Sequence, residues 1–344
     1  MTGGDAGLRL WAGAGALTVA AVLSSVLIVL LLPLLRRHAL ARPNARSSHR
    51  KPTPQGGGMA VIAATIIVTV GGIGVLGEMH SAAAAEVFTV LAATAFMAVV
   101  GGIDDVRPLP VAPRLVFQML AIAVAIAAIP TDVRFVASIP WWAERLCLLV
   151  GLVWFVNLVN FMDGIDWMTV AEAVPVAASV VLLGQLETFP PASTILAVAL
   201  LGAMLGFAPF NKPVARLFLG DVGSLPIGLL LGWLLVQLAR NGQPAAALLL
   251  PLYYVADATV TLIRRIAARE TFWQAHRSHF YQRAGDRGFS VREVVWMVFA
   301  TNLLLAGLAF VTAAKPSTAG TVASLLMGAA LVAWLLFTFA RGKR

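Results

Sequence analysis

The sequence is dominated by apolar runs that are long enough to cross a lipid bilayer, and they recur from one end of the chain to the other. A helix needs about 17–25 apolar residues to span the hydrocarbon core. Hydrophobic residues make up 60% of the chain and charged residues only 12%, whereas a soluble domain has about 25% charged residues. We therefore predict an all-α integral membrane protein with about eleven transmembrane helices, near residues 10–35, 57–77, 86–103, 114–130, 142–159, 168–186, 192–210, 222–239, 245–263, 293–313 and 319–340.

The basic residues are distributed unevenly over the loops between these runs. With the amino terminus outside, 20 of the 25 lysines and arginines fall on the inner side. The others are Arg9, Arg134, Arg145, Arg240 and Lys315. Because cytoplasmic loops are enriched in Lys and Arg, this asymmetry predicts an outer amino terminus and a cytoplasmic carboxy terminus. The net charge of +9 is thus explained by topology, and no nucleic-acid partner is expected.

The chain has the organisation of one polytopic domain, expected over residues 1–344. Its first run is too long for the apolar region of a signal peptide, and no cleavage-like sequence follows, so we expect this helix to be retained. The single cysteine, Cys147, excludes a disulfide framework and a CxxC-type zinc site. The inner loops, which we expect to carry the chemistry, lie near residues 36–56, 104–113, 160–167, 211–221 and 264–292.

Five aspartates lie at the predicted inner ends of three different spans. Asp104 and Asp105 follow the third span, Asp163 and Asp166 follow the fifth, and Asp221 comes directly before the eighth. Any one of them alone is most simply a solvated loop acid or a helix cap. Several carboxylates beside apolar spans are costly to bury, however, unless a cation or a proton neutralises them. Mg²⁺, which binds oxygen ligands together with waters and substrate phosphates, is the simplest such cation.

Polar residues recur at steps of three at the end of the fifth span, namely Asn157, Asn160, Asp163 and Asp166. In an α-helix each step turns the direction of the side chain by about −60°, so the four would turn through about 180°. A regular helix cannot aim all of them at one point. Either only the middle pair faces the site or the helix breaks at Gly164. We favour Asn160 and Asp163 as direct participants, with Asp166 nearby.

Two inner segments carry groups that suit an anion. Segment 49–58 ends in three glycines, whose amides could bind an anion at the start of the second span; a flexible turn with tight helix packing is the alternative. Loop 264–292 is the longest and most basic, and it contains His276, Arg277 and His279. Contacts to phosphate and sugar fit these residues. A loop that only sets topology and touches anionic lipid is the alternative.

Asp257 is the one acid placed deep within a predicted span, two turns inside the ninth. An acid in such a position is by default a candidate functional residue. It could equally be bonded to a Ser, Thr or Arg of a neighbouring helix and contribute only to packing. The sequence favours neither interpretation.

Five motifs follow one another along the inner segments: His-Arg-Lys-Pro-Thr-Pro-x-Gly-Gly-Gly over 49–58, Asp104-Asp105, Asn160-x-x-Asp163-Gly, Gly220-Asp221-x-Gly-Ser224, and His276-x-x-His279. Together they resemble the motifs of the polyprenyl-phosphate N-acetylhexosamine-1-phosphate transferases, the MraY/WecA family, over nearly the whole chain. The resemblance implies transfer of a sugar-1-phosphate from a UDP-sugar to undecaprenyl phosphate, with release of UMP and dependence on Mg²⁺, or alternatively Mn²⁺. It also implies a bacterial cytoplasmic membrane, with the active site facing the cytoplasm; a homodimer is left open.

The resemblance also implies catalytic, metal-binding and substrate-binding roles for the residues of the inner segments. We expect Asp104, Asp105 and Asp163 to be catalytic and Asp221, with support from Asp105, to bind the metal. The lipid phosphate would attack the β-phosphorus directly, because phosphoryl transfer needs mainly positioning and neutralisation of charge; a covalent aspartyl-phosphate route is the weaker alternative. The residues expected to bind substrate are Asn157, Asn160, Asp166, Gly220, Ser224, His49, Lys51, Thr53, His276, Arg277 and His279.

The chain departs from two patterns within the family. Pro108 stands where the GlcNAc-1-phosphate branch has a third acid, and His-Arg-Ser-His at 276–279 stands where the peptidoglycan-precursor branch has three histidines. Both departures resemble the O-antigen-initiating (WbpL-like) branch, which uses UDP-activated deoxy sugars such as FucNAc or QuiNAc. A phospho-MurNAc-pentapeptide transferase is the alternative within the family. A transporter is the alternative from another class, but it would place polar groups near the bilayer midplane.

Overall fold

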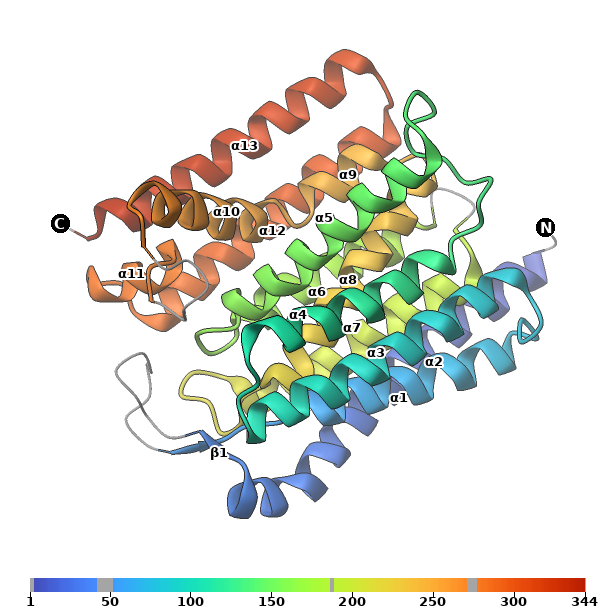
Figure 1. Cartoon of the computed structure of the whole chain (residues 1–344). Helices are drawn as coiled ribbons and strands as arrows, with labels where there is room; N and C mark the ends of the chain where they lie inside the picture. Colours follow the sequence, from blue (N-terminus) through green and yellow to red (C-terminus); the bar gives the residue numbers. More distant parts are fainter. Residues whose placement is uncertain (1–2, 42–51, 186–188, 271–276, 344) are drawn as a thin grey trace.

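The computed structural model describes residues 3–41, 52–185, 189–270 and 277–343. The long helices run roughly parallel to one another, with α1 along one edge of the bundle and α13 along the opposite edge (Figure 1). The elements in chain order are α1 Gly3–His38, β1 Leu40–Ala41, β2 Thr53–Pro54, α2 Gly58–Val75, α3 Ala82–Val106, α4 Val111–Ala127, α5 Trp141–Met162, α6 Met168–Leu183, α7 Pro191–Asn211, α8 Asp221–Arg240, α9 Pro244–Leu249, α10 Leu252–Ala267, α11 Phe280–Asp286, α12 Val291–Ala314 and α13 Thr318–Arg341.

The helices coincide with the predicted spans. Among the described residues, eight are long and apolar enough to cross a membrane, namely α1, α2, α3, α5, α7, α8, α12 and α13, while α4 and α6 are apolar but shorter. The all-α membrane fold is therefore confirmed, and the count of eleven spans stays a prediction. The two termini lie at opposite ends of the bundle (Figure 1).

The ninth predicted span, 245–263, is not one continuous helix. α9 ends at Leu249, and α10 begins at Leu252 after Pro251. Proline has no N–H to donate, and its ring clashes with the carbonyl four residues earlier, so it interrupts a helix at this position. Asp257 thus lies one to two turns into a new helix. The buried residues of that helix include Tyr253, Asp257, Thr261 and Arg265, which recur every four positions.

The centre of the bundle is formed by α7 and α8. In their most apolar windows, 89% of α8 and 72% of α7 are buried, against 17% of α1. Glycines let neighbouring helices approach α8 at backbone distance. A Cβ atom on Gly101 of α3 would lie 2.2 Å from the backbone oxygen of Asp221, and one on Gly58 of α2 would lie 2.2 Å from the Cα of Gly223. The inner ends of α2, α3 and α8 therefore meet closely.

A short backbone ladder ties the start of α2 to the connection between α7 and α8. β1 and β2 form an antiparallel pair in which Leu40 faces Pro54. The Phe218 amide donates to the Pro54 carbonyl at 2.8 Å, and the Phe218 carbonyl accepts from the Gly57 amide at 2.9 Å. The Gly58 amide donates to the Leu219 carbonyl at 2.9 Å. These bonds hold the segment before α8 in one position beside α2.

Candidate active site

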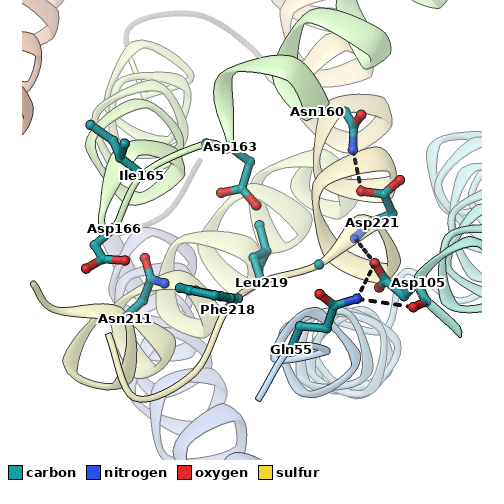
Figure 2. A pocket seen from close by; sticks show the side chains of 12 residues that line it. Gln55, Asp105, Asn160, Asp163, Ile165, Asp166, Asn211, Phe218, Leu219 and Asp221 are labelled. Carbon is teal, nitrogen blue, oxygen red and sulfur yellow. Dashed lines mark hydrogen bonds between the residues drawn. The ribbon is translucent and has the colours of Figure 1, made fainter. Parts of the chain in front are cut away.

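A cavity of about 220 Å³ lies where the inner ends of α3, α5 and α8 meet (Figure 2). Its lining comes from four segments that are far apart in the chain: the strand before α2, the end of α3, the α5–α6 connection and the α7–α8 connection. The lining residues are Gln55, Asp105, Asn160, Asp163, Gly164, Ile165, Asp166, Asn211, Phe218, Leu219, Gly220 and Asp221. The structure thus gathers four of the five predicted aspartates, with Asn160 and Gly220, around one cavity.

Asp105 caps the start of α8 from a different helix. The residue before α8, Gly220, has a φ of 77° and no side chain to cap the helix. Instead, the Asp105 carboxylate accepts from the Asp221 amide at 2.9 Å and from the Val222 amide at 3.0 Å. Gln55 Nε2 also donates to Asp105 Oδ1, at 3.2 Å; Figure 2 marks this bond and the one from the Asp221 amide. A carboxylate is favourable at the positive end of a helix, so Asp105 fixes the position of Asp221.

Asp104 is buried and paired with an arginine. Its Oδ1 accepts from the Leu109 amide at 2.6 Å, and its Oδ2 accepts from Arg114 Nη1 at 3.0 Å. Arg114 Nη1 also lies 4.0 Å from Asp221 Oδ2, so this arginine stands between two aspartates of the site. From the sequence, Arg114 is only one of the 20 basic residues assigned to the inner side. Its position at the start of α4, ten residues after Asp104, was the available signal.

The side chain of Asp221 is held by Asn160 from a neighbouring helix. Asn160 Nδ2 donates to Asp221 Oδ1 and to Ser224 Oγ, both at 2.8 Å. Asn160 comes from α5, whereas Asp221 and Ser224 belong to the first turn of α8. The second carboxylate oxygen of Asp221 lies 4.0 Å from Arg114 Nη1. The bonds of Asn160 to Asp221 and Ser224 were not predicted from the sequence, and the expected contact of Asn160 with the substrate stays a prediction.

The point at which α5 ends determines which of the four polar residues spaced three apart line the cavity. α5 ends at Met162, with Asp163 as its C-cap, so the chain leaves the helix just before Gly164. Because of this break, Asp166 also lines the cavity. Asn157 is not among the lining residues; its amide donates to Gln118 Oε1 at 2.7 Å and joins α5 to α4. The structure therefore places Asn157 in helix packing and not beside the expected substrate.

Asp163 lies outside the spanning helices, in a buried environment that it shares with two other acids. Burial raises the pKa of its carboxyl from 3.8 to about 7, the charges of Asp105 and Asp166 add to the rise, and a hydrogen bond from Thr169 opposes it. The Thr169 hydroxyl donates to Asp163 Oδ1 at 2.5 Å. A carboxyl with such a pKa can gain or lose a proton, or exchange that proton for a cation, near neutral pH.

Asp163→Asn should raise the melting temperature of the metal-free protein, and more so at pH 8 than at pH 5. The folded carboxyl has the higher pKa, so the folded state loses stability as the pH rises from about 4 to about 7, and the loss is complete above that window. Asparagine keeps an acceptor for Thr169 and removes the charge. Thermal unfolding in detergent with a chelator checks this; an equal shift at both pH values would contradict the raised pKa of Asp163.

The far end of the cavity combines an aromatic ring with polar groups. Phe218, Ile165, Asp166 and Asn211 lie together there (Figure 2). Asp166 Oδ2 accepts from the Ala215 amide at 3.0 Å, and Asn211 Oδ1 accepts from the Trp167 amide at 2.7 Å. These bonds hold the α5–α6 and α7–α8 connections against each other. Asn211, Phe218 and Gln55 were missed in the sequence, because only the folded chain brings them beside the acids.

The glycine run before α2 does not offer amides to an anion, as we had considered. The Gly57 and Gly58 amides already donate to the Phe218 and Leu219 carbonyls. All three glycines are buried, and a Cβ on Gly57 would lie 2.7 Å from the Phe207 ring. Tight packing, the alternative interpretation, is confirmed. Thr53 is buried in β2, while His49 and Lys51 lie outside the described residues.

The structure describes the basic loop on both sides of residues 271–276, and His276 lies outside the described residues. Arg277 Nη2 pairs with Asp286 Oδ1 at 3.3 Å. His279 is buried, and its Nδ1 lies 3.3 Å from Asp257 Oδ1. Neither residue lines the cavity, although α11 adjoins it: a Cβ on Gly164 would lie 2.1 Å from the Tyr281 hydroxyl. The expected contacts of Arg277 and His279 with a substrate stay predictions.

The cavity offers oxygen ligands to a cation, but no complete set. Within the described ranges, no three of the His, Cys, Asp and Glu side chains are placed to hold a metal by themselves. The described lining of the cavity contains acids and amides and neither His nor Cys. Such a donor set fits a hard ion that keeps waters and takes substrate phosphates as ligands, which is how Mg²⁺ usually binds. It does not fit zinc.

Comparisons with known proteins agree with this site. Residues 87–239, from α3 to α8, match the profile of glycosyl transferase family 4. Decaprenyl-phosphate N-acetylglucosaminephosphotransferase of Mycobacterium leprae is 27% identical over 334 residues, covering 86% of this chain and 82% of the relative. A probable undecaprenyl-phosphate N-acetylglucosaminyl 1-phosphate transferase of Bacillus subtilis is 24% identical, with 84% and 82% covered. Phospho-N-acetylmuramoyl-pentapeptide-transferase of Leuconostoc citreum is 26% identical, with 87% and 98% covered.

The fold, the acid-lined cavity and these relatives define a membrane-bound sugar-phosphate transferase. Over most of its length the chain is similar to polyprenyl-phosphate N-acetylglucosamine phosphotransferases and to phospho-N-acetylmuramoyl-pentapeptide-transferases, in agreement with the resemblance of its inner-loop motifs. The transporter alternative is thereby wrong. The polar residues of the cavity lie together at one end of the helices, whereas a transporter would place such groups near the bilayer midplane.

Proposed function

We propose that this protein transfers a sugar-1-phosphate from a UDP-sugar to undecaprenyl phosphate and releases UMP. The observation that carries the proposal is the meeting of acids from α3, the α5–α6 connection and α8 around one cavity, with Arg114 at its edge. Acids in this number suit a diphosphate that binds together with a divalent cation. Two similar proteins support the same reaction, because they are named as transferases that act on a polyprenyl phosphate and an N-acetylglucosamine phosphate.

The reaction forms one phosphorus–oxygen bond and breaks another. An oxygen of the lipid phosphate bonds to the β-phosphorus of the UDP-sugar, and the bond from that phosphorus to the oxygen bridging the α- and β-phosphates breaks. UMP leaves with the bridging oxygen, and the sugar diphosphate remains on the lipid. A phosphate monoester has a second pKa near 6, so it is mostly dianionic at pH 7 and needs little help from a base. Direct attack is therefore favoured over a covalent aspartyl-phosphate.

Arg114 and Asp104 would place the lipid phosphate. The arginine is 3.0 Å from Asp104 and 4.0 Å from Asp221, so an incoming phosphate can become its new partner through charge-assisted hydrogen bonds. Asp104 would then orient the phosphate or accept its last proton. Asp105 would act through α8, because its carboxylate already accepts two amides of that helix.

Asp221 and Asp163 would hold Mg²⁺ on the diphosphate. Bound there, the ion would supply neutralisation of the charge that builds up on the leaving phosphate. Asn160 would keep Asp221 in its rotamer, since it donates both to Asp221 Oδ1 and to Ser224 Oγ of the same helix. Mn²⁺ has a similar preference for oxygen ligands and is the alternative ion.

The nucleotide end of the donor would lie toward Phe218 and Asn211. An aromatic face beside amide and carboxylate groups can hold a base by stacking and by hydrogen bonds. Asp166 would contribute mainly by holding the α7–α8 connection through the Ala215 amide. The diphosphate would then extend from Phe218 toward Asp221, which follows it by three residues on the same connection.

The sugar is proposed from the two departures in the motifs. Pro108 and the His-Arg-Ser-His sequence at 276–279 support the O-antigen-initiating branch and a UDP-activated deoxy sugar, FucNAc or QuiNAc. The product would begin an O-antigen or another cell-envelope polysaccharide. The enzyme would be one polytopic domain in the cytoplasmic membrane of a bacterium, with its amino terminus outside and its cavity open to the cytoplasm, as the basic inner loops favour.

A donor panel tests the proposal. Purified protein with undecaprenyl phosphate and Mg²⁺ is given UDP-GlcNAc, UDP-FucNAc, UDP-QuiNAc or UDP-MurNAc-pentapeptide, and UMP and the lipid product are measured. We expect turnover with a deoxy sugar and none without the lipid. Turnover of the MurNAc donor alone would assign the peptidoglycan step instead. UMP release without lipid would support the covalent route.

A further inference from the structure

Asp257 is a fully buried acid that the proposed reaction does not use. It lies on α10 and is 0% exposed. Both of its oxygens accept hydrogen bonds from protein groups. Oδ1 accepts from the Phe280 amide at 3.0 Å and from the Thr261 hydroxyl at 3.3 Å. Oδ2 accepts from the Tyr253 hydroxyl at 3.1 Å and from the Tyr281 amide at 3.2 Å. A charge buried in this way requires such bonds.

Two of these donors are the first backbone amides of α11. Phe280 and Tyr281 are the first residues of that helix, and His279 is its N-cap. A capping box joins His279 to Gln282, and Asp257 adds a cap from a separate helix by accepting from the first two amides. Asp105 does the same for α8. A carboxylate at this position also interacts favourably with the positive end of the helix.

The same carboxylate contacts the ring of His279. Nδ1 of the imidazole lies 3.3 Å from Asp257 Oδ1. The ring stacks on Tyr281, with 5.8 Å between ring centres, and its centre is 6.4 Å from that of Phe161. Asp257 therefore helps to fix the orientation of His279.

The start of α11 adjoins the acid-bearing connection. The Tyr281 hydroxyl donates to the Phe161 carbonyl at 3.0 Å, and Gly164 has no room for a Cβ beside that hydroxyl. Phe161 and Gly164 lie on either side of Asp163 in the chain. A shift of α11 would therefore displace the chain around Asp163 as well as His279.

We infer that Asp257 is a positioning residue, which caps α11 and holds His279 so that the segment from Arg277 to His279 stands beside the Asp163 turn for contact with the sugar diphosphate. The inference rests on the transfer reaction proposed above for its functional part. The cap itself does not depend on that reaction. One acid thus couples α10 to the donor-binding side of the cavity.

Two substitutions distinguish the capping of α11 by Asp257 from its contact with His279. His279→Asn keeps a donor near the place of Nδ1 and removes the rest of the ring. Asp257→Asn keeps the size of the side chain and removes the charge and one acceptor oxygen. We expect Asp257→Asn to lose hydrogen-exchange protection at Phe280 and Tyr281 and also to lose transfer, on the order of tenfold in kcat/KM. His279→Asn should lose transfer but keep the protection.

The double variant and a distant control complete the test. If Asp257 acts through His279, adding Asp257→Asn to His279→Asn should lower kcat/KM by much less than tenfold, because coupled residues are not additive. Asp132→Asn, in the exposed connection between α4 and α5, should change neither property. Unchanged exchange in Asp257→Asn would overturn the cap, and fully multiplicative losses would overturn the action through His279. If the wild type showed no transfer at all, the proposed function would be wrong. Hydrogen exchange at Phe280 and Tyr281 would still test whether Asp257 caps α11.

Discussion

Replacing Asp221 by asparagine is expected to lower UMP release by on the order of 10² to 10³-fold, the usual effect of removing one electrostatic contact to the reacting groups. Asparagine keeps an oxygen that can accept from Asn160, which donates to Asp221 Oδ1 at 2.8 Å. The first turn of α8 should therefore keep its structure. What is lost is the negative charge that would hold the divalent ion against the diphosphate.

The measurement is UMP release in membranes or detergent, with undecaprenyl phosphate and the donor found in the panel. Asp132→Asn is the matched control, because the same substitution is made at an exposed acid between α4 and α5. A melting temperature close to that of the wild type would show that the variant is folded. Should Asp221→Asn release UMP at the wild-type rate, the placement of the metal on Asp221 is wrong.

Gly101→Ala is expected to prevent correct docking of α3 on α8. The added Cβ would lie 2.2 Å from the backbone oxygen of Asp221 and 2.5 Å from its carbonyl carbon. These are backbone atoms and cannot rotate away as a side chain could, so the helices must separate. Overpacking of this kind costs about 1–3 kcal/mol, and the separation would also break the two bonds from α8 amides to Asp105. Both the melting temperature and UMP release should fall.

The neighbouring glycine provides the control. A Cβ on Gly102 would first meet Val222 Cγ2 at 3.5 Å, which is an ordinary contact. Gly102→Ala makes the same chemical change one residue further along α3 and should behave like the wild type. If the two variants had equal melting temperatures and activities, the close approach of α3 and α8 at Gly101 would be disproved.

Local pattern was enough to predict the helices and the ends at which the acids lie. Apolar runs locate the helices because each must be long enough for the bilayer, and acids at the ends of those runs fall on one side when the basic loops are assigned. The ninth run shows the limit of this reasoning. Its apolar residues continue across Pro251, and the proline was visible, but composition alone gave no reason to divide the run into α9 and α10.

What could not be predicted depends on contacts between distant parts of the chain. Asp105 was expected to support the metal, but its two bonds to α8 amides appear only when α3 packs on α8. Arg114 was one inner arginine among many until α4 placed it beside Asp104. For Asp257 the sequence favoured neither a functional role nor a packing role. Only the position of α11 in the folded chain shows which groups bond to its carboxylate.

The capping of α8 by Asp105 has a consequence for the order in which the protein is made. The two partners are separated by 116 positions in the chain, so α3 enters the membrane long before the helix that its aspartate will cap. Until α8 has been synthesised and inserted, the acids of α3 and of the α5–α6 connection have no common cavity. A nascent chain therefore lacks the cavity, which forms only after the distant halves of the bundle have packed together.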